Sequence, residues 1–119
     1  MGARTNFTFK TDTGLITLYS HWGGDSKKHD LANALEKANG RLQMGDIGYA
    51  LRIIISNLIG TEWDQETGFG LYIGDEGGEE QYEPVTVDLT NKTVIDETGT
   101  HNIFDYIAYH TVLAEQDLG

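Results

Sequence analysis

The segment that most constrains the fold lies between Asp46 and Gly60, where apolar residues would cover nearly every side of a helix. A helix that is apolar all round is normally buried. The consecutive isoleucines at 53–55 also permit a strand, but the length of the segment favours a helix. We therefore predict a buried helix with Asp46 as its N-cap, an end near Leu58 and Gly60 as its stop signal.

Two strands and a further helix are predicted before this segment. Alternating and β-rich residues at Phe7–Phe9 and Leu15–Tyr19 flank a short turn, which is the pattern of a hairpin. A narrow apolar stripe at helical spacing then predicts a helix that starts at Asp25 or Ser26 and ends near Gly40. The stripe consists of Leu31, Ala34, Leu35 and Ala38.

Three strands and a short helix are predicted after the buried helix. The strands are expected at Thr67–Gly74, Val85–Leu89 and Thr93–Ile95, separated by polar and turn-forming residues. The polar segment Glu97–Thr100 predicts a loop rather than a strand. Asn102 is expected to cap a short helix at the C-terminal end.

The order of these elements predicts one α+β domain over residues 1–119. We expect about five mainly antiparallel strands, two helices packed on them and a short C-terminal helix, in the order ββααβββα. No apolar run approaches the ~20 residues that cross a bilayer, and the first residues lack the apolar stretch of a secretory signal. The chain has no cysteine, which excludes disulfides.

The charge of the chain is strongly negative and unevenly spread. The formal net charge is -11, and Lys92 is the only lysine or arginine after Gly60. The acidic half is either a solvated surface that aids solubility or a face that binds a basic partner. The acidic loop that begins at Asp75 is either mobile and solvated or a loose Ca²⁺ site, although it lacks the spacing of an EF-hand. Direct nucleic-acid binding is not expected, because the basic patch that it requires is missing. The candidate partner-binding residues are Asp75, Glu76, Glu79, Glu80 and Glu83.

A candidate ligand site follows the predicted strand that ends at Tyr19. Here a phenol, a hydroxyl, an imidazole and an indole lie beside glycines, which permit a sharp turn or the close approach of a ligand. His21 suits a general base or a pH switch, and Trp22 suits stacking on a planar ligand. The alternatives are a histidine hydrogen-bonded to the structure and a tryptophan that closes the core. The candidate ligand-binding residues of this turn are Tyr19, Ser20, His21, Trp22 and Gly23.

Tyr49 and Arg52 are the second part of this candidate ligand site. They lie about one turn apart on the predicted apolar helix, where an arginine must find a partner or reach solvent. With its bidentate guanidinium, Arg52 suits the capture of a phosphate or a carboxylate. The alternative is an ion pair with an acidic side chain. The acidic residues considered for that pair are Asp46, Glu62 and Asp88.

No motif in the chain identifies a reaction. The histidines at 21, 29, 101 and 110 lack metal-ligand spacing, no serine lies in a GxSxG context, and there is no cysteine nucleophile. A hydrolase with His21 as its base would therefore lack a recognisable catalytic partner. We accordingly predict no catalytic residue, metal or cofactor, leave enzymatic activity open, and favour binding as the function.

Four sequence blocks resemble a family of small uncharacterised proteins of tailed bacteriophages: Leu18–Gly24, Tyr49–Ile54, Glu66–Leu71 and Val85–Leu89. The resemblance covers most of residues 17–95, and the first block, LYSHWGG, is its most distinctive part. It implies a phage-encoded accessory protein that works in the cytoplasm of a host bacterium.

By analogy with other small acidic phage proteins, two functions are expected. The first is a non-enzymatic inhibitor of a bacterial defence system, such as an anti-CRISPR protein. It would bind a host protein through its acidic face, for example at a basic nucleic-acid-binding surface. The alternative is a protein that binds or sequesters a nucleotide signal with the turn at His21–Gly23 and with Arg52. Neither function requires a membrane, and a homodimer is compatible with both.

Overall fold

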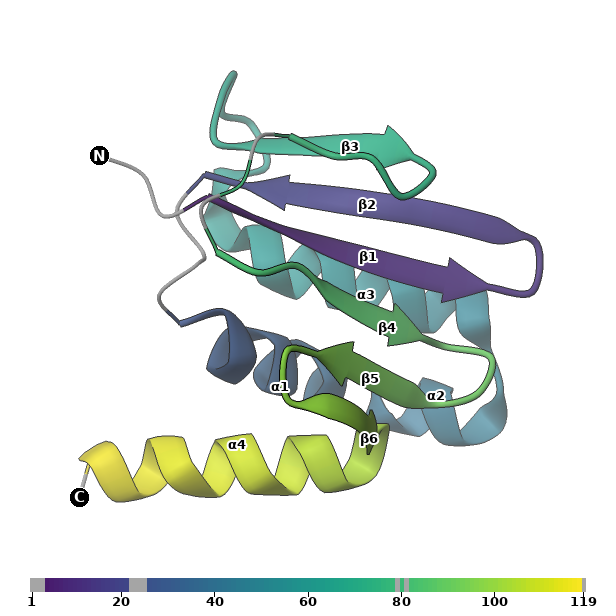
Figure 1. Ribbon diagram of the computed structural model, residues 1–119, viewed down its shortest axis with the longest axis vertical. Helices are drawn as coiled ribbons and strands as arrows, with labels where there is room; N and C mark the ends of the chain where they lie inside the picture. The colour runs from purple at the N-terminus through teal and green to yellow at the C-terminus, as the bar shows by residue number, and fades with distance from the viewer. Residues whose placement is uncertain (1–3, 22–25, 79, 81, 119) are drawn as a thin grey trace.

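The computed structural model describes residues 4–21, 26–78, 80 and 82–118, and it describes side chains as far as His110. It contains a sheet that carries helices on one face (Figure 1). The strands are β1 (Thr5–Thr11), β2 (Gly14–Ser20), β3 (Phe69–Ile73), β4 (Val85–Asp88), β5 (Thr93–Asp96) and β6 (Gly99–Asn102). The helices are α1 (Lys27–Lys37), α2 (Asn39–Met44), α3 (Ile47–Ile59), the short 3-10 helix η1 (Gly60–Glu62) and α4 (Ile103–Leu118).

The six described strands form one mixed sheet in the order β3-β2-β1-β4-β5-β6. Every neighbouring pair is antiparallel except β1 and β4, which are parallel. The parallel pair arises because the chain leaves β2, forms helices on one face and β3 at the far edge, and then returns beside β1. The α+β class is therefore confirmed, whereas the expected number of about five strands is wrong.

The additional strand is β6, which lies in a stretch whose polar sequence predicts a loop. The Asp96 carboxylate accepts hydrogen bonds from the backbone nitrogen of Thr98 at 2.8 Å and from its hydroxyl, which closes a tight turn. Gly99 follows with a φ of 124°, a conformation that favours glycine. The turn places Val94 opposite His101, so a stretch without apolar alternation becomes an edge strand.

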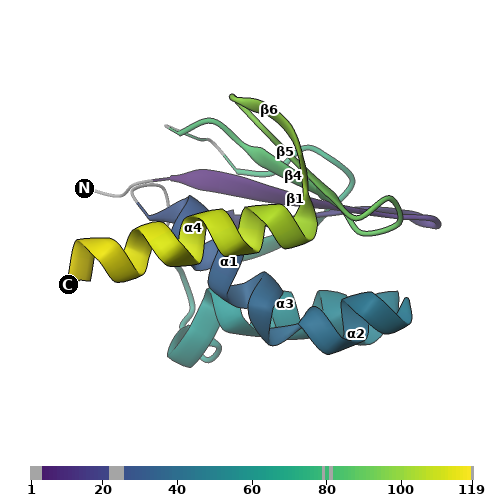
Figure 2. The same cartoon turned by 90° about the horizontal axis from the view of Figure 1, so that it is seen from below.

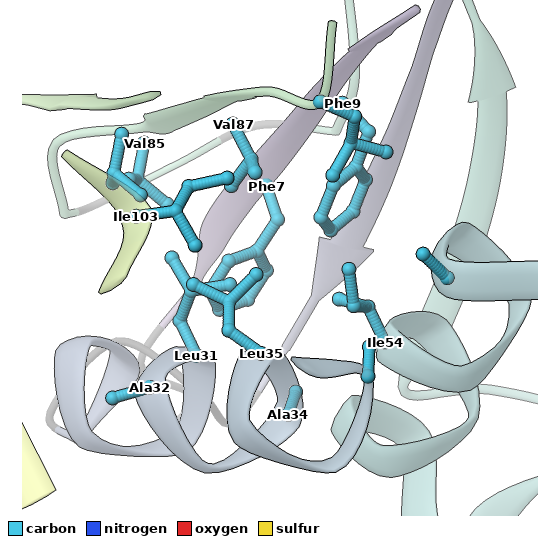
Figure 3. Close-up of a cluster of buried hydrophobic side chains, with 14 of the residues drawn as sticks. Phe7, Phe9, Leu31, Ala32, Ala34, Leu35, Ile54, Val85, Val87 and Ile103 are labelled. Atoms are coloured by element: carbon cyan, nitrogen blue, oxygen red, sulfur yellow. The ribbon is translucent and has the colours of Figure 1, made fainter. Parts of the chain in front are cut away.

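The core lies between one face of the sheet and the helices below it (Figure 2). The strand register pairs Phe7 with both Leu18 and Val85, so the three side chains point to the same face. Leu31 and Leu35 of α1 pack against this face (Figure 3). Burial of a side chain of this size contributes roughly 1.5–3 kcal/mol, so this layer holds the helices on the sheet.

The helices differ from their predicted bounds. The first predicted helix is divided into two. Helix α1 ends at Lys37, Ala38 has a ψ of 1°, and α2 begins at Asn39. The division occurs here because Asn39 and Gly40 are weak helix formers. The last helix is long rather than short, because the sequence of α4 contains neither glycine nor proline. Among the helices in the described part of the chain, none is long and apolar enough to cross a membrane.

Helix α3 begins as predicted, because the Asp46 carboxylate accepts a hydrogen bond from the backbone nitrogen of Tyr49 at 3.4 Å. Its burial is one-sided, however. Ala50 and Ile54 are buried in the core, whereas Tyr49 and Arg52 are exposed. The prediction of burial on all sides is wrong, because the described elements leave the outer side of α3 open to solvent.

Candidate functional site

Residues 74–83 are called the acidic segment here, and their described part, residues 74–78, 80, 82 and 83, lies along the face of the sheet that is opposite the helices (Figure 1). Near its start, the Thr17 hydroxyl donates a hydrogen bond to the carbonyl oxygen of Gly74 at 2.7 Å. Farther along, the Asn6 side chain donates to the carbonyl oxygen of Gly78 at 2.9 Å and accepts from the Gly78 nitrogen at 3.1 Å. These bonds attach the acidic segment to β1 and β2.

The end of the acidic segment is also attached. The Asn6 amide donates to Glu80 Oε2 at 2.6 Å. The carbonyl oxygen of Glu83 accepts hydrogen bonds from Lys27 Nζ and from the hydroxyl of Thr5. These hydrogen bonds define the path of the described part of the segment over the sheet.

Gly77 and Gly78 allow the acidic segment to approach the sheet this closely. A Cβ atom on Gly77 would overlap with the side chains of Asn6 and Thr17, and a Cβ atom on Gly78 would overlap with the ring of Tyr19. A glycine avoids both overlaps because it has no Cβ atom. Tyr19, one of the predicted ligand-binding residues, therefore lies beneath the acidic segment.

Strand β3 forms one edge of the sheet and exposes large apolar side chains. Ile73 is 95% exposed, and Leu71 and Tyr72 are also exposed. Natural edge strands are usually short, charged or covered. The opposite edge of the sheet follows this rule, because β6 is a short strand that leads directly into α4. Several exposed apolar side chains on an open strand edge are typical of a surface that binds another protein.

A shallow groove of about 170 Å³ lies beside β3. Its walls include Trp63, Phe69 and Leu71, and Trp63 is 52% exposed. We call the exposed residues around this strand the edge surface: Trp63, Leu71, Tyr72, Ile73, Asp75 and Glu76. Sequence reasoning missed its apolar part, because the glycine-bounded pattern of Thr67–Gly74 predicts a strand without showing whether it is central or at an edge.

The predicted partner-binding residues lie next to this surface. Asp75 and Glu76 are exposed and follow Ile73 along the chain after Gly74, so exposed carboxylates come soon after the apolar strand. Glu80 and Glu83 are exposed farther along the acidic segment. One predicted residue lies outside the described residues, namely Glu79.

The turn that follows β2 is held by local hydrogen bonds. The Tyr19 hydroxyl and His21 Nδ1 lie 3.1 Å apart, and the backbone nitrogen of His21 donates to the carbonyl oxygen of Gly68 at 2.8 Å. Ser20 is buried. This arrangement agrees with the alternative of a histidine that is hydrogen-bonded to the structure at a strand end. Two predicted residues lie outside the described residues: Trp22 and Gly23.

Tyr49 and Arg52 lie on the solvent side of α3, and the structure does not bring them to Tyr19. The guanidinium carbon of Arg41 lies 4.8 Å from the centre of the Tyr49 ring, and Arg41 Nη1 pairs with Asp46 Oδ2 at 3.2 Å. Arg52 is exposed. Helix α3 packs on one face of the sheet, whereas Tyr19 lies beneath the acidic segment on the other. The described members of the predicted ligand site therefore do not surround one ligand.

The edge surface has the chemistry of a docking site for a polypeptide, because it combines an open strand edge with apolar side chains and carboxylates. Among the side chains that the structure describes, no group of three or more His, Asp or Glu residues is placed to hold a metal ion. Comparisons of the chain with models of protein families, with curated proteins and with solved structures find no match.

Proposed function

We propose that this chain is a phage-encoded accessory protein that inhibits a bacterial defence system by binding a host protein through the edge surface. The observation that supports this proposal most is the exposure of Leu71, Tyr72 and Ile73 on an edge strand, which the exposed Asp75 and Glu76 follow in the sequence after Gly74. The four sequence blocks that resemble a phage protein family support a phage origin and, with it, action in the cytoplasm of the host.

The edge surface indicates the chemistry of the partner. An extended segment of the partner would add a strand to β3, and the backbone hydrogen bonds of that pairing would provide affinity. Apolar side chains of the segment would cover Leu71 and Ile73, which lie on the same side of β3, and its lysines or arginines would meet Asp75 and Glu76. A basic nucleic-acid-binding surface of a defence nuclease would supply the lysines and arginines, and the acidic charge of this chain would accelerate its binding.

A second copy of the chain is a less suitable occupant of β3. Pairing of two β3 strands would bring two copies of the acidic segment near each other, and the net charge of -11 opposes association. Light scattering during size-exclusion chromatography is therefore expected to show a monomer at low and high protein concentration. A dimer that persists at low salt and is lost in Ile73→Thr would instead assign the edge surface to self-association.

Affinity capture from a bacterial lysate tests the proposal. The immobilised protein should retain a host protein at low salt and release it as ionic strength rises, because salt screens exposed charges. Ile73→Thr should reduce capture, whereas Ile95→Thr, at an exposed position of β5, should not. Glu76→Lys should also reduce capture, whereas Glu36→Lys, the same charge change at an exposed position of α1, should not.

A functional assay completes this test. Expression of the chain in a bacterium that carries the defence system should raise the plating efficiency of a sensitive phage, and Ile73→Thr should abolish the effect. The proposal would be contradicted if lysates of defended bacteria contained no salt-sensitive partner. It would also be contradicted if neither Ile73→Thr nor Glu76→Lys changed the retention of a captured protein.

The alternative function, capture of a nucleotide signal by the turn at His21–Gly23 together with Arg52, has less support. Tyr19 and the solvent side of α3 lie on opposite sides of the sheet, so one nucleotide would not contact both. A thermal-shift screen against a nucleotide panel distinguishes the two functions. A shift that disappears in Arg52→Ala would favour the alternative.

A further inference from the structure

A second concavity lies beside β6, at the opposite edge of the sheet from the edge surface. Its volume is about 580 Å³, which falls within the range of about 300–1,000 Å³ that is typical of small-molecule pockets. Lys28 of α1, His101 of β6 and one side of α4 form its walls. The α4 residues that line it are Asp105, Tyr106, Tyr109 and His110.

Aromatic rings form much of this wall. Tyr106, Tyr109 and His110 are spaced as i, i+3 and i+4, which places them on one side of α4. The ring centre of Tyr106 lies 4.3 Å from that of His110 and 6.0 Å from that of His101. The rings of Tyr109 and His110 meet edge to face at 5.0 Å. The spacing along α4 is visible in the sequence, but only the fold brings His101 and Lys28 to the same cavity.

The Tyr106 hydroxyl is buried in the wall of this cavity. Tyr106 is 3% exposed, and its hydroxyl has no hydrogen-bond partner among the described residues. Buried hydroxyls in proteins are nearly always paired, because an unpaired one has lost its hydrogen bonds to water without replacement. Burial and the nearby carboxylates of Asp96 and Glu97 raise the pKa of Tyr106, so the hydroxyl keeps its proton and can donate a hydrogen bond.

The charge around the cavity is negative. Lys28 Nζ lies 2.5 Å from Glu97 Oε1 and 3.7 Å from Asp96 Oδ2, and Lys27 Nζ lies 4.0 Å from Glu97 Oε2, so the two lysines and the two carboxylates balance each other. The hydrogen bond from Lys28 lowers the pKa of Glu97. Burial opposes the ionisation of Asp96, but hydrogen bonds from Thr98 and the charge of Lys28 outweigh it, and the pKa of Asp96 is lowered as well. With Asp105 also in the wall, the cavity would repel an anionic ligand.

We propose that this cavity binds an uncharged, planar nitrogen heterocycle of the size of a purine nucleoside. The rings of Tyr109 and His110 provide stacking surfaces, which suit any nucleobase because each has a π face. Tyr106 lies in the same wall, and a rotation of its ring would let its buried hydroxyl donate to a ring nitrogen or a carbonyl oxygen of the ligand. Burial lowers the pKa of His110, so its imidazole is neutral near pH 7 and adds one donor and one acceptor. The proposal does not depend on the edge surface.

Titration of the full chain with adenosine, followed by nuclear magnetic resonance or calorimetry, tests this proposal. Tyr106→Phe keeps the ring and removes the hydroxyl, so it should weaken adenosine binding by about three- to tenfold, which is the contribution of one neutral hydrogen bond. Because the hydroxyl has no partner among the described residues, this variant should unfold at the same temperature as the wild type or at a higher one.

Two large exposed side chains provide a comparison. Tyr109→Ala should weaken adenosine binding by at least about fivefold through the loss of stacking. Met44→Ala, at an exposed position of α2, should leave the binding unchanged. Equal effects of the two variants would show that the cavity is not the binding site.

The charge of the ligand gives an independent readout. Adenosine monophosphate should bind more weakly than adenosine, and the difference should shrink as salt is raised. Tighter binding of the monophosphate would overturn the assignment of an uncharged ligand. The proposal would also be overturned if adenosine, guanosine and uridine all failed to bind, or if Tyr106→Phe bound adenosine as tightly as the wild type.

Discussion

Replacement of Asn6 by alanine is expected to detach the acidic segment from the sheet. The Asn6 side chain donates to the carbonyl oxygen of Gly78 at 2.9 Å and to Glu80 Oε2 at 2.6 Å, and it accepts from the Gly78 nitrogen at 3.1 Å. Asn6 is 6% exposed, so little water is present to replace these bonds while the segment stays in place. A neutral hydrogen bond contributes about 0.5–1.5 kcal/mol, and one to a charged group about 1.5–3 kcal/mol.

The expected loss in the free energy of unfolding for Asn6→Ala is about 2–4 kcal/mol. The loss stays below the full value of the bonds, because a detached segment can hydrogen-bond to water, and Glu80 is already exposed. Urea unfolding measures the global loss. Amide hydrogen exchange in residues 74–83 measures the local release, and protection there should fall more than in the core strands.

Two variants control for other effects of the substitution. Asn57→Ala removes an exposed side chain that makes one hydrogen bond, at 3.5 Å to the carbonyl oxygen of Ile53, and should change stability by less than about 0.5 kcal/mol. Asn6→Asp keeps the acceptor but places a second carboxylate against Glu80, so it should destabilise at pH 7 and recover stability in mild acid. The reasoning would be refuted if Asn6→Ala cost less than about 0.5 kcal/mol and left hydrogen exchange in the acidic segment unchanged.

Two further predictions concern packing and pH. Gly78→Ala places a Cβ atom against the Tyr19 ring and should cost about 1–3 kcal/mol in urea unfolding, whereas Gly40→Ala in α2, which has open space around it, should stabilise by up to about 1 kcal/mol. Equal effects of the two variants would contradict the observed path of the acidic segment. The pKa values of Asp96 and Glu97 are lowered in the folded state, so their ionised carboxylates stabilise the fold. This contribution is complete above their ordinary pKa values of 3.8 and 4.5, and it is lost as the pH falls through their pKa values in the folded protein. Denaturation between about pH 6 and pH 3 should show this loss, and Asp96→Asn should reduce it; an undiminished loss in the variant would refute the assignment to Asp96.

Local interactions made several elements predictable from the sequence. The cap at Asp46 acts over a few residues, so the start of α3 agrees with its prediction. The side-chain period that predicts the first helix is also short, and Leu31 and Leu35 do face the core. The same short range explains the errors, since a polar turn such as the one after Asp96 can form either a loop or a hairpin until a neighbouring strand is present.

In the candidate sites, too, the sequence shows the local features, whereas the contacts between distant residues depend on the fold. The acidic composition of residues 75–83 is evident in the sequence, but their attachment depends on Asn6, which is separated from Gly78 by 72 positions. The turn at Tyr19–His21 is distinctive as a motif, yet its hydrogen bonds are largely structural in the described residues. Arg52 shares the apolar helix with core residues and still faces solvent.

The sequence by itself determined the charge, the turns, most strands and the start of α3, because caps, glycines and side-chain periods act within a few residues of one another. Only the tertiary structure decided that β1 pairs in parallel with β4, that β3 is an open edge and that the rings of α4 share a cavity with Lys28. The physical reason is that pairing and cavity formation depend on contacts between distant segments, and no local pattern specifies which segments will meet.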